Sequence, residues 1–459
     1  MKEKFNKILK SGDSLANILY YWLPEMISNT MLVSLPPLID SFIIASLQST
    51  TTYGALGMAN NFLHFLIKLA EAIPVASIAI MGRHNGAQDY KKCGEDLGDA
   101  FWTTTIIGIS LFVIIFFGAN SIFQLIGVPA KMAIKGVPFL RLRSFGILLT
   151  FISLSFFAFM RALKNTKTPM FIYLIGMIIF ISLDYTLVLG KFGFSPMGLN
   201  GSAIASIIQY LIMIAISISY ILINADYKKY FTKIFVNHFN IHRVKKLIGL
   251  SLPIMIDKGS LAASYVVLSK MIAPMGKYAI ASYDIIKNME RFAILPAVGF
   301  AQIIVFLVSN RLGAKDPEGA KSNIKKVMTL SFIMLIITLG FLCIKADYLV
   351  SFFDPKNKIS FLAAPALVFI SLLVVFDFVQ LILAGALRGA GDVKAVMKVR
   401  FFSCLFFFMP IVYIFGKLPI QNQVLKFVLI YGSFYLNTGI MGIFFLKRIK
   451  TPKWQNKNI

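Results

Sequence analysis

Long stretches without any charged residue constrain the fold of this chain more than any other feature. Residues 101–130, 192–225 and 427–446 contain no Asp, Glu, Lys or Arg and are mostly apolar. A helix needs about 20 such residues to cross a hydrocarbon core roughly 30 Å thick. Only helices and closed barrels satisfy their backbone hydrogen bonds there. Because these stretches lack the alternating pattern of barrel strands, we predict an all-α polytopic membrane protein.

The composition agrees with this class. Of 459 residues, 58% are hydrophobic and only 14% are charged, whereas about 25% of the residues in an ordinary soluble domain are charged. We predict twelve transmembrane helices. Their expected bounds are 17–47, 54–81, 100–120, 139–160, 169–190, 198–223, 247–273, 279–308, 327–345, 360–387, 399–416 and 427–446.

The chain is also strongly basic, with 46 Lys and Arg against 20 Asp and Glu and a net charge of +26. In a soluble protein this excess would suggest a nucleic-acid partner, but here it marks topology. Six Lys and Arg lie in 224–246 and five in 309–326, whereas 191–197 and 274–278 hold one each. Basic residues gather on the cytoplasmic side. We therefore predict a multi-pass protein of the cytoplasmic (inner) membrane, with both termini cytoplasmic and no nucleic-acid partner.

The chain repeats itself. Gly-Ala-Gln-Asp at 86–89 recurs 227 residues later as Gly-Ala-Lys-Asp at 313–316, and Arg161 and Arg388 share this spacing. Because each matched pair falls on the same predicted side, we expect two parallel six-helix repeats that form a V-shaped two-lobe bundle with a central cleft. The predicted lobes are residues 1–225 and 247–459, joined by a basic cytoplasmic linker at 226–246.

Carboxylates inside the predicted spans are the first functional candidates, because a charge near the bilayer centre costs on the order of 2.5 kcal/mol or more. The candidates for ion or proton coupling are Asp40, Asp184, Asp257 and Asp377. Burial favours a protonated carboxyl group, whereas a bound sodium ion favours the charged form. Such a carboxylate can therefore hold H⁺ or Na⁺, and we expect no other cofactor and no bound metal.

A proline pair in the first span and two polar residues in later spans are further functional candidates. Pro36 and Pro37 precede Asp40 and each removes a helical hydrogen bond, so we predict a conformational hinge in the first span. Glu290 and Gln380 are predicted to line a substrate cavity. Lys287 lies three residues before Glu290, a spacing that favours pairing of these charges on one helix face.

Several segments, taken in order, resemble the multidrug and toxic compound extrusion (MATE) transporters. They are Leu23-Pro24, Ile-Asp-Ser-Phe at 39–42, Gly-Ala-Gln-Asp at 86–89, Arg-Ala-Leu at 161–163, Leu-Asp-Tyr at 183–185, Gly-Leu-Asn-Gly-Ser-Ala-Ile-Ala at 198–205, Pro-Ala-Val-Gly at 296–299 and Leu-Arg-Gly at 387–389. The resemblance extends over nearly the whole chain. It implies export of organic, often cationic compounds, driven by inward flow of protons or sodium ions.

The resemblance also assigns positions. Asp40 and Asp184 match the aspartates of the family's amino-terminal half, and Ser206 stands for a small hydroxyl residue expected in the sixth span. Asp377 matches an acid of the tenth span, and Asp257 resembles an acid of the seventh. One branch of the family has an asparagine one turn before the second aspartate, where this chain has Phe180. This difference makes a complete sodium site in the first half less favoured than a protonation role.

The sequence thus predicts a monomeric secondary antiporter that exports small organic compounds, cationic and amphipathic, by alternating access. The alternative is a flippase of the same superfamily that moves lipid-linked oligosaccharides or polysaccharides. We expect no enzymatic activity, because the chain has no zinc-protease, P-loop or paired-acid motif.

Overall fold

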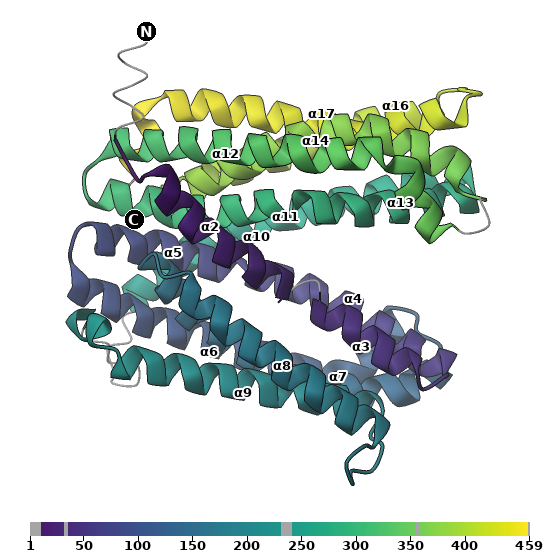
Figure 1. The fold of residues 1–459 in the computed structure, drawn as a ribbon, viewed down its shortest axis with the longest axis horizontal. Coiled ribbons are helices and arrows are strands. Elements are labelled where there is room, and N and C mark those ends of the chain that lie inside the picture. The colour runs from purple at the N-terminus through teal and green to yellow at the C-terminus, as the bar shows by residue number, and fades with distance from the viewer. Residues whose placement is uncertain (1–10, 32–34, 231–240, 355–357, 458–459) are drawn as a thin grey trace. The chain divides into compact units, whose positions relative to one another are not determined.

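The computed structural model describes residues 11–31, 35–230, 241–354 and 358–457, and all regular structure among them is helical (Figure 1). The elements are α2 (Leu15–Asn29), α3 (Leu35–Ala45), α4 (Thr50–Ala70), α5 (Ala72–Gly86), α6 (Tyr90–Leu125), α7 (Ala130–Ala162), α8 (Lys167–Leu189), α9 (Leu199–Ile223), η2 (Ala225–Tyr230), α10 (Ile241–Ile272), η3 (Ala273–Met275), α11 (Lys277–Gly313), α12 (Pro317–Ile344), α13 (Ala346–Phe353), α14 (Ser360–Gly389), α15 (Val393–Ser403), the π-helical η4 (Cys404–Phe408), α16 (Met409–Lys417), α17 (Gln423–Lys450) and η5 (Pro452–Trp454).

Within the described residues, eleven helical segments are long and apolar enough to cross a membrane. They correspond to the second through twelfth predicted spans. Some are longer than the hydrophobic pattern indicated: α6 extends over 36 residues where the sequence predicts 100–120. Polar and charged residues at their ends continue the helices beyond the apolar segments. The chain is a multi-pass membrane protein.

The first predicted span is only partly described by the structure. The sequence predicts one helix over 17–47, and the structure describes α2 and α3 within this range, while residues 32–34 between them lie outside the described part. Pro36 and Pro37 are the second and third described residues of α3. Because the residues just before α3 are not described, the hinge at these prolines stays a prediction.

The chain folds as two compact units whose boundaries differ from those of the predicted lobes. The N-terminal unit is Leu23–Ser251, and the C-terminal unit combines the chain up to Trp22 with Leu252–Ile459. The early segment packs with the C-terminal unit through hydrogen bonds. Asn323 donates to Asp13 at 2.7 Å, and the Lys326 ammonium donates to the carbonyl oxygens of Ser11 and Asp13 at 2.8 Å each.

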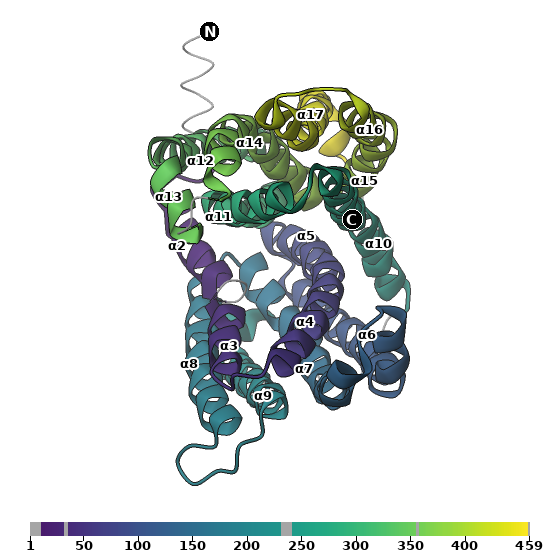
Figure 2. The same ribbon diagram turned by 90° about the vertical axis from the view of Figure 1, so that its right-hand side faces the viewer.

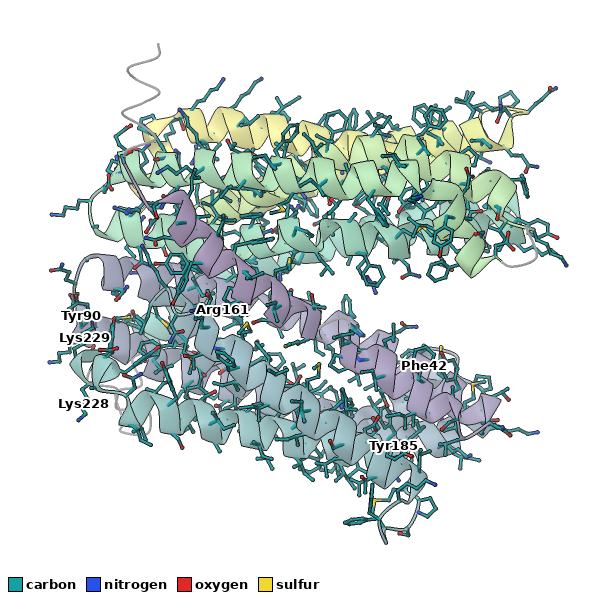
Figure 3. All side chains as sticks on the ribbon, viewed as in Figure 1. Phe42, Tyr90, Arg161, Tyr185, Lys228 and Lys229 are labelled. Atoms are coloured by element: carbon teal, nitrogen blue, oxygen red, sulfur yellow. The ribbon has the colours of Figure 1, made fainter. Side chains whose placement is uncertain are left out.

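The described part of the predicted linker belongs to the N-terminal unit, and its residues 231–240 lie outside the described residues. Two contacts attach it to this unit. The Tyr230 hydroxyl donates to Asn85 at 2.7 Å, and Arg243 of α10 pairs with Asp99 of α6 at 2.9 Å. Lys229 also lies over the ring of Tyr90 at 4.5 Å, and Figure 3 labels both residues.

In the N-terminal unit, α7 packs against α4, α5, α6 and α9, and α8 packs against both α9 and α3. Figure 2 shows α3, α8 and α9 as neighbours in this unit. Gly201 permits the close approach of α9 to α8, because a Cβ atom there would lie 2.8 Å from the carbonyl carbon of Leu187. This approach places the first turns of α9 beside the part of α8 that carries Asp184.

In the C-terminal unit, α14 packs against α11, α12 and α17. Its core is mostly aliphatic and also contains the fully buried rings of Phe300, Phe306, Phe378 and Phe408. Polar side chains enter this core from α10, α11, α14 and α15. Buried polar groups need partners. A polar side chain that is fully paired within this core is therefore interpreted as structural, and one that is not is a functional candidate.

Candidate functional site

A cavity with a mixed apolar and polar lining lies inside the N-terminal unit, with about 1220 Å³ of empty space that includes open solvent. Its polar lining residues include Asp40, Asn60, His64, Glu71, Arg143 and Gln209. Pro36, Pro37 and Phe180 also line it. The predicted hinge and the first predicted carboxylate therefore border the same cavity.

Asp40 is held at the cavity by a hydroxyl group from another helix. Its carboxylate is 5% exposed and accepts a hydrogen bond from Ser202 of α9 at 2.9 Å. Arg143 of α7 also interacts with it electrostatically. Three helices, α3, α7 and α9, thus converge on this carboxylate.

Asp184 of α8 joins the same group of charges. It is 0% exposed, and neither carboxylate oxygen has a hydrogen-bond partner among the described residues. Its electrostatic neighbours are Asp40 and Arg143, and the Ser202 hydroxyl, which donates to Asp40, also lies near it. A buried carboxylate without hydrogen bonds is costly, so a bound proton or small cation would remove a large penalty. Asp40, Asp184, Ser202 and Arg143 are called the carboxylate cluster below.

The hydroxyl that the resemblance assigns to the cluster comes from a different serine. Ser206 donates to the Ala203 carbonyl oxygen of its own helix at 2.7 Å, whereas Ser202, about one turn earlier, donates to Asp40. Sequence reasoning missed Ser202 although it lies in the matched segment 198–205. It also missed Arg143, whose charge inside a predicted span was the available signal.

The two predicted aspartates of the C-terminal unit have partners. Asp257 of α10 pairs with Arg388 of α14 and, at 2.8 Å, with Arg400 of α15. Asp377 accepts a hydrogen bond from Gln380 at 2.8 Å, and the Gln380 side-chain oxygen accepts one from Arg400. These residues form one continuous buried network. The structure therefore places Gln380 inside a chain of polar contacts that joins both aspartates.

The N-terminal unit contains a counterpart of the Asp257 pair. Arg161, labelled in Figure 3, contacts Glu25 of α2 through two nitrogens, at 2.7 Å and 3.0 Å. Arg161 and Arg388 are the arginines that the repeat places 227 residues apart. In each unit, an arginine in the last turn of α7 or α14 pairs with a buried acid, on α2 or α10 respectively. No pattern in the sequence connects Glu25 with Arg161, which lies 136 residues away.

Glu290 is buried in the C-terminal unit and accepts a hydrogen bond from the Tyr431 hydroxyl. The expected pairing along its helix does not occur. Lys287 has no ion pair among the described residues, and its ammonium lies over two tyrosine rings instead. The cavity that contains Asp40 is not lined by Glu290 or Gln380.

The sequence matches the model of the MatE family over residues 26–186 and 253–414. The two matched segments begin 227 residues apart, which is the spacing of the internal repeat. The chain belongs to the MatE family. It is therefore a membrane transporter and not an enzyme.

Similar proteins are known in several organisms. The chain is 26% identical, over 83% of its length and 82% of the relative's, to a probable multidrug resistance protein NorM of Mannheimia succiniciproducens. Its fold is similar to that of the Vibrio cholerae MATE transporter VcmN in the bent form, with a TM-score of 0.87, 15% identity and coverage of 96% and 98%. A MOP superfamily transporter from Pyrococcus furiosus gives a TM-score of 0.85 at 17% identity, with coverage of 97% and 98%. These likenesses support the MATE fold.

Proposed function

We propose that this MatE family member exports amphipathic organic cations in exchange for protons, with Asp40 and Asp184 as the coupling groups. The observation that carries the proposal is the fully buried Asp184, whose two oxygens lack hydrogen-bond partners, next to Asp40 at the cavity. The name of the Mannheimia relative, a probable multidrug resistance protein, supports organic compounds as the exported class.

The charges of the carboxylate cluster suggest how the exchange works. Two carboxylates and one guanidinium leave a single net negative charge when both acids are ionised. One monovalent cation or one proton neutralises this charge, so the two compete for the same state of the cavity. The organic cation binds only when the proton has left, and the proton binds only when the cation has left. A transporter that opens this cluster alternately to the two sides of the membrane therefore exchanges the cation for the proton.

Phe180 favours the proton over sodium in this proposal. It lines the cavity and supplies no oxygen ligand, whereas sodium, like other hard cations, is held by several oxygen atoms. A proton needs only one carboxylate. Sodium coupling through the cluster would have to rely on the two carboxylates and Ser202.

Transport in proteoliposomes tests the proposal. The purified protein should move a fluorescent organic cation when a proton gradient is imposed, and a sodium gradient alone should have little effect. Lipid vesicles without protein give the background flux. Flux driven by sodium alone would contradict proton coupling, and flux that ignores both gradients would contradict antiport and leave the flippase alternative.

A further inference from the structure

A lysine ammonium lies among aromatic rings inside the C-terminal unit. Lys287 of α11 is half-buried, and its Nζ lies 5.1 Å from the ring centroid of Tyr265 of α10 and 5.3 Å from that of Tyr283. In the part of the chain that the structure describes, no carboxylate lies within ion-pair distance of this ammonium. The faces of the two tyrosine rings are therefore its direct partners.

A buried acid completes this site. Glu290 is 7% exposed and accepts a hydrogen bond from Tyr431 of α17, while its second oxygen is buried without a hydrogen-bond partner among the described residues. The Tyr283 hydroxyl is likewise buried without a partner, and the rings of Tyr283 and Tyr431 meet edge to face at 5.3 Å. Tyr265, Tyr283, Tyr431 and Glu290 are called the tyrosine box.

The tyrosine box has the chemistry of a site for an organic cation. Aromatic faces attract cations through their quadrupole, and the attraction is strongest where water is excluded. The buried Glu290 oxygen supplies a negative charge beside the rings. Lys287 interacts electrostatically with this acid as well as with the rings, so the protein's own ammonium fills the place that such a cation would take.

We propose that the tyrosine box binds a small organic ammonium compound, and that Lys287 is a tethered cation that occupies the box until the compound displaces it. The stem of lysine is flexible and its head is strongly hydrated, which allows the ammonium to leave. Asp284 and Arg291, the other charged neighbours on α11, are both exposed. The inference rests on the proposed function only for the class of ligand.

Displacement has a measurable consequence. The apparent affinity for the ligand is the intrinsic affinity multiplied by the fraction of molecules in which Lys287 has left the box. Removal of the lysine charge raises this fraction to one. We therefore expect the Lys287→Met variant to bind a cation more tightly than the native protein, which is the opposite of what a ligand-binding lysine would show.

Equilibrium dialysis of the purified full-length protein in detergent, with benzyltrimethylammonium as the probe, tests this. We expect Lys287→Met to lower the Kd about tenfold, since loss of an attraction of cation–π size corresponds to roughly one order of magnitude. Lys287→Arg keeps the charge and should bind as the native protein does. The matched control is Lys277→Met, which removes an exposed lysine that lies over Tyr278 at 5.2 Å, outside the box.

Three results would overturn the proposal. They are an unchanged or weaker affinity in Lys287→Met, an equal gain in Lys277→Met, and a gain that survives Glu290→Gln in the Lys287→Met background. If Lys287→Met is poorly folded, Lys287→Gln serves in its place under the same criteria. If the variants bind the probe as expected but the protein shows no gradient-driven transport, the proposed function is contradicted. The proposal that the tyrosine box binds an organic ammonium compound would still hold.

Discussion

Asp40 and Asp257 are both buried aspartates on the first helices of their repeats, yet their partners differ. Asp40 accepts one hydrogen bond from a serine, whereas Asp257 contacts two arginine side chains. An acid with two guanidinium partners is already compensated. We therefore interpret Asp257 as a group that holds α10, α14 and α15 together and Asp40 as one that can exchange its proton.

The role of Asp257 can be tested by its effect on stability. Asp257→Asn leaves Arg388 and Arg400 buried without their acid, and removal of one partner of a buried ion pair costs about 3–5 kcal/mol. Unfolding of the purified protein in detergent should show this loss. Asp284→Asn, at an exposed position of the same unit, should leave the free energy of unfolding nearly unchanged. Similar stability of the two variants would contradict the structural role.

The two serines of α9 offer a sharper comparison. Ser202→Ala removes a hydrogen bond to a carboxylate, a type of bond that contributes about 1.5–3 kcal/mol, so proton-driven export should slow about tenfold. Ser206→Ala removes only a bond to its own helix and should export nearly as the native protein does. Initial rates at a series of external pH values measure both. Equal rates in the two variants would place the functional hydroxyl elsewhere.

At this scale the sequence could identify the acids but not their partners. The cost of a charge in an apolar span singles out Asp40, Asp184, Asp257 and Asp377 without a structure. Arg388 lies 131 residues from Asp257 and Ser202 lies 162 residues from Asp40. No periodicity connects positions so far apart, because helix packing brings them together.

Two glycines of α14 allow this helix to pack closely against α11. A Cβ atom on Gly389 of α14 would lie 2.3 Å from the Val305 carbonyl oxygen of α11, and one on Gly385 would lie 2.6 Å from that of Ala301. Because backbone atoms cannot move aside as a flexible side chain can, α11 and α14 can pack this closely only while both positions remain glycine.

This contact predicts a contrast between two glycines of the C-terminal unit. Gly389→Ala should lower the free energy of unfolding by about 1–3 kcal/mol, the usual cost of overpacking. Gly259→Ala, where nothing lies within 4 Å of the added Cβ, should instead stabilise α10 by about 0.5–1 kcal/mol. Thermal unfolding of both variants measures the difference. A stable Gly389→Ala protein would show that the two helices are less closely packed.

Helix existence could be predicted from the sequence better than helix ends. Eleven apolar segments appear as helices at the predicted places. The first span is described only in part, because residues 32–34 between α2 and α3 lie outside the described residues. Helix ends are harder to predict because polar residues continue a helix beyond its apolar segment, as α6 shows by extending from Tyr90 to Leu125 around the predicted 100–120.

For the molecule as a whole, the repeat could be predicted but the boundary between the units could not. The 227-residue spacing reappears in the two segments that match the MatE family. The described residues from 11 to Trp22 nevertheless pack with the C-terminal unit. Long-range contacts, such as those of Asp13 with Asn323 and Arg311, decide this division, and no motif in the sequence marks them.

The distribution of Lys and Arg predicts the orientation of the chain, which labelling of introduced cysteines can test. We expect a membrane-impermeant maleimide to label Ser195→Cys in intact cells and Gln88→Cys only after the cells are permeabilised. The native Cys93, Cys343 and Cys404 are replaced by alanine beforehand. Labelling of Gln88→Cys in intact cells would contradict cytoplasmic termini.

In the mechanism proposed here, the carboxylate cluster exchanges a proton for an organic cation. The most direct measurement is proton movement caused by the substrate, recorded with a pH-sensitive dye inside proteoliposomes. When an organic cation is added outside without an imposed gradient, the native protein should move protons in the direction opposite to the cation. The Asp40→Asn protein should move none, because its cluster has no net negative charge left for a proton or a cation to neutralise. Proton movement by Asp40→Asn at the native rate would contradict the account.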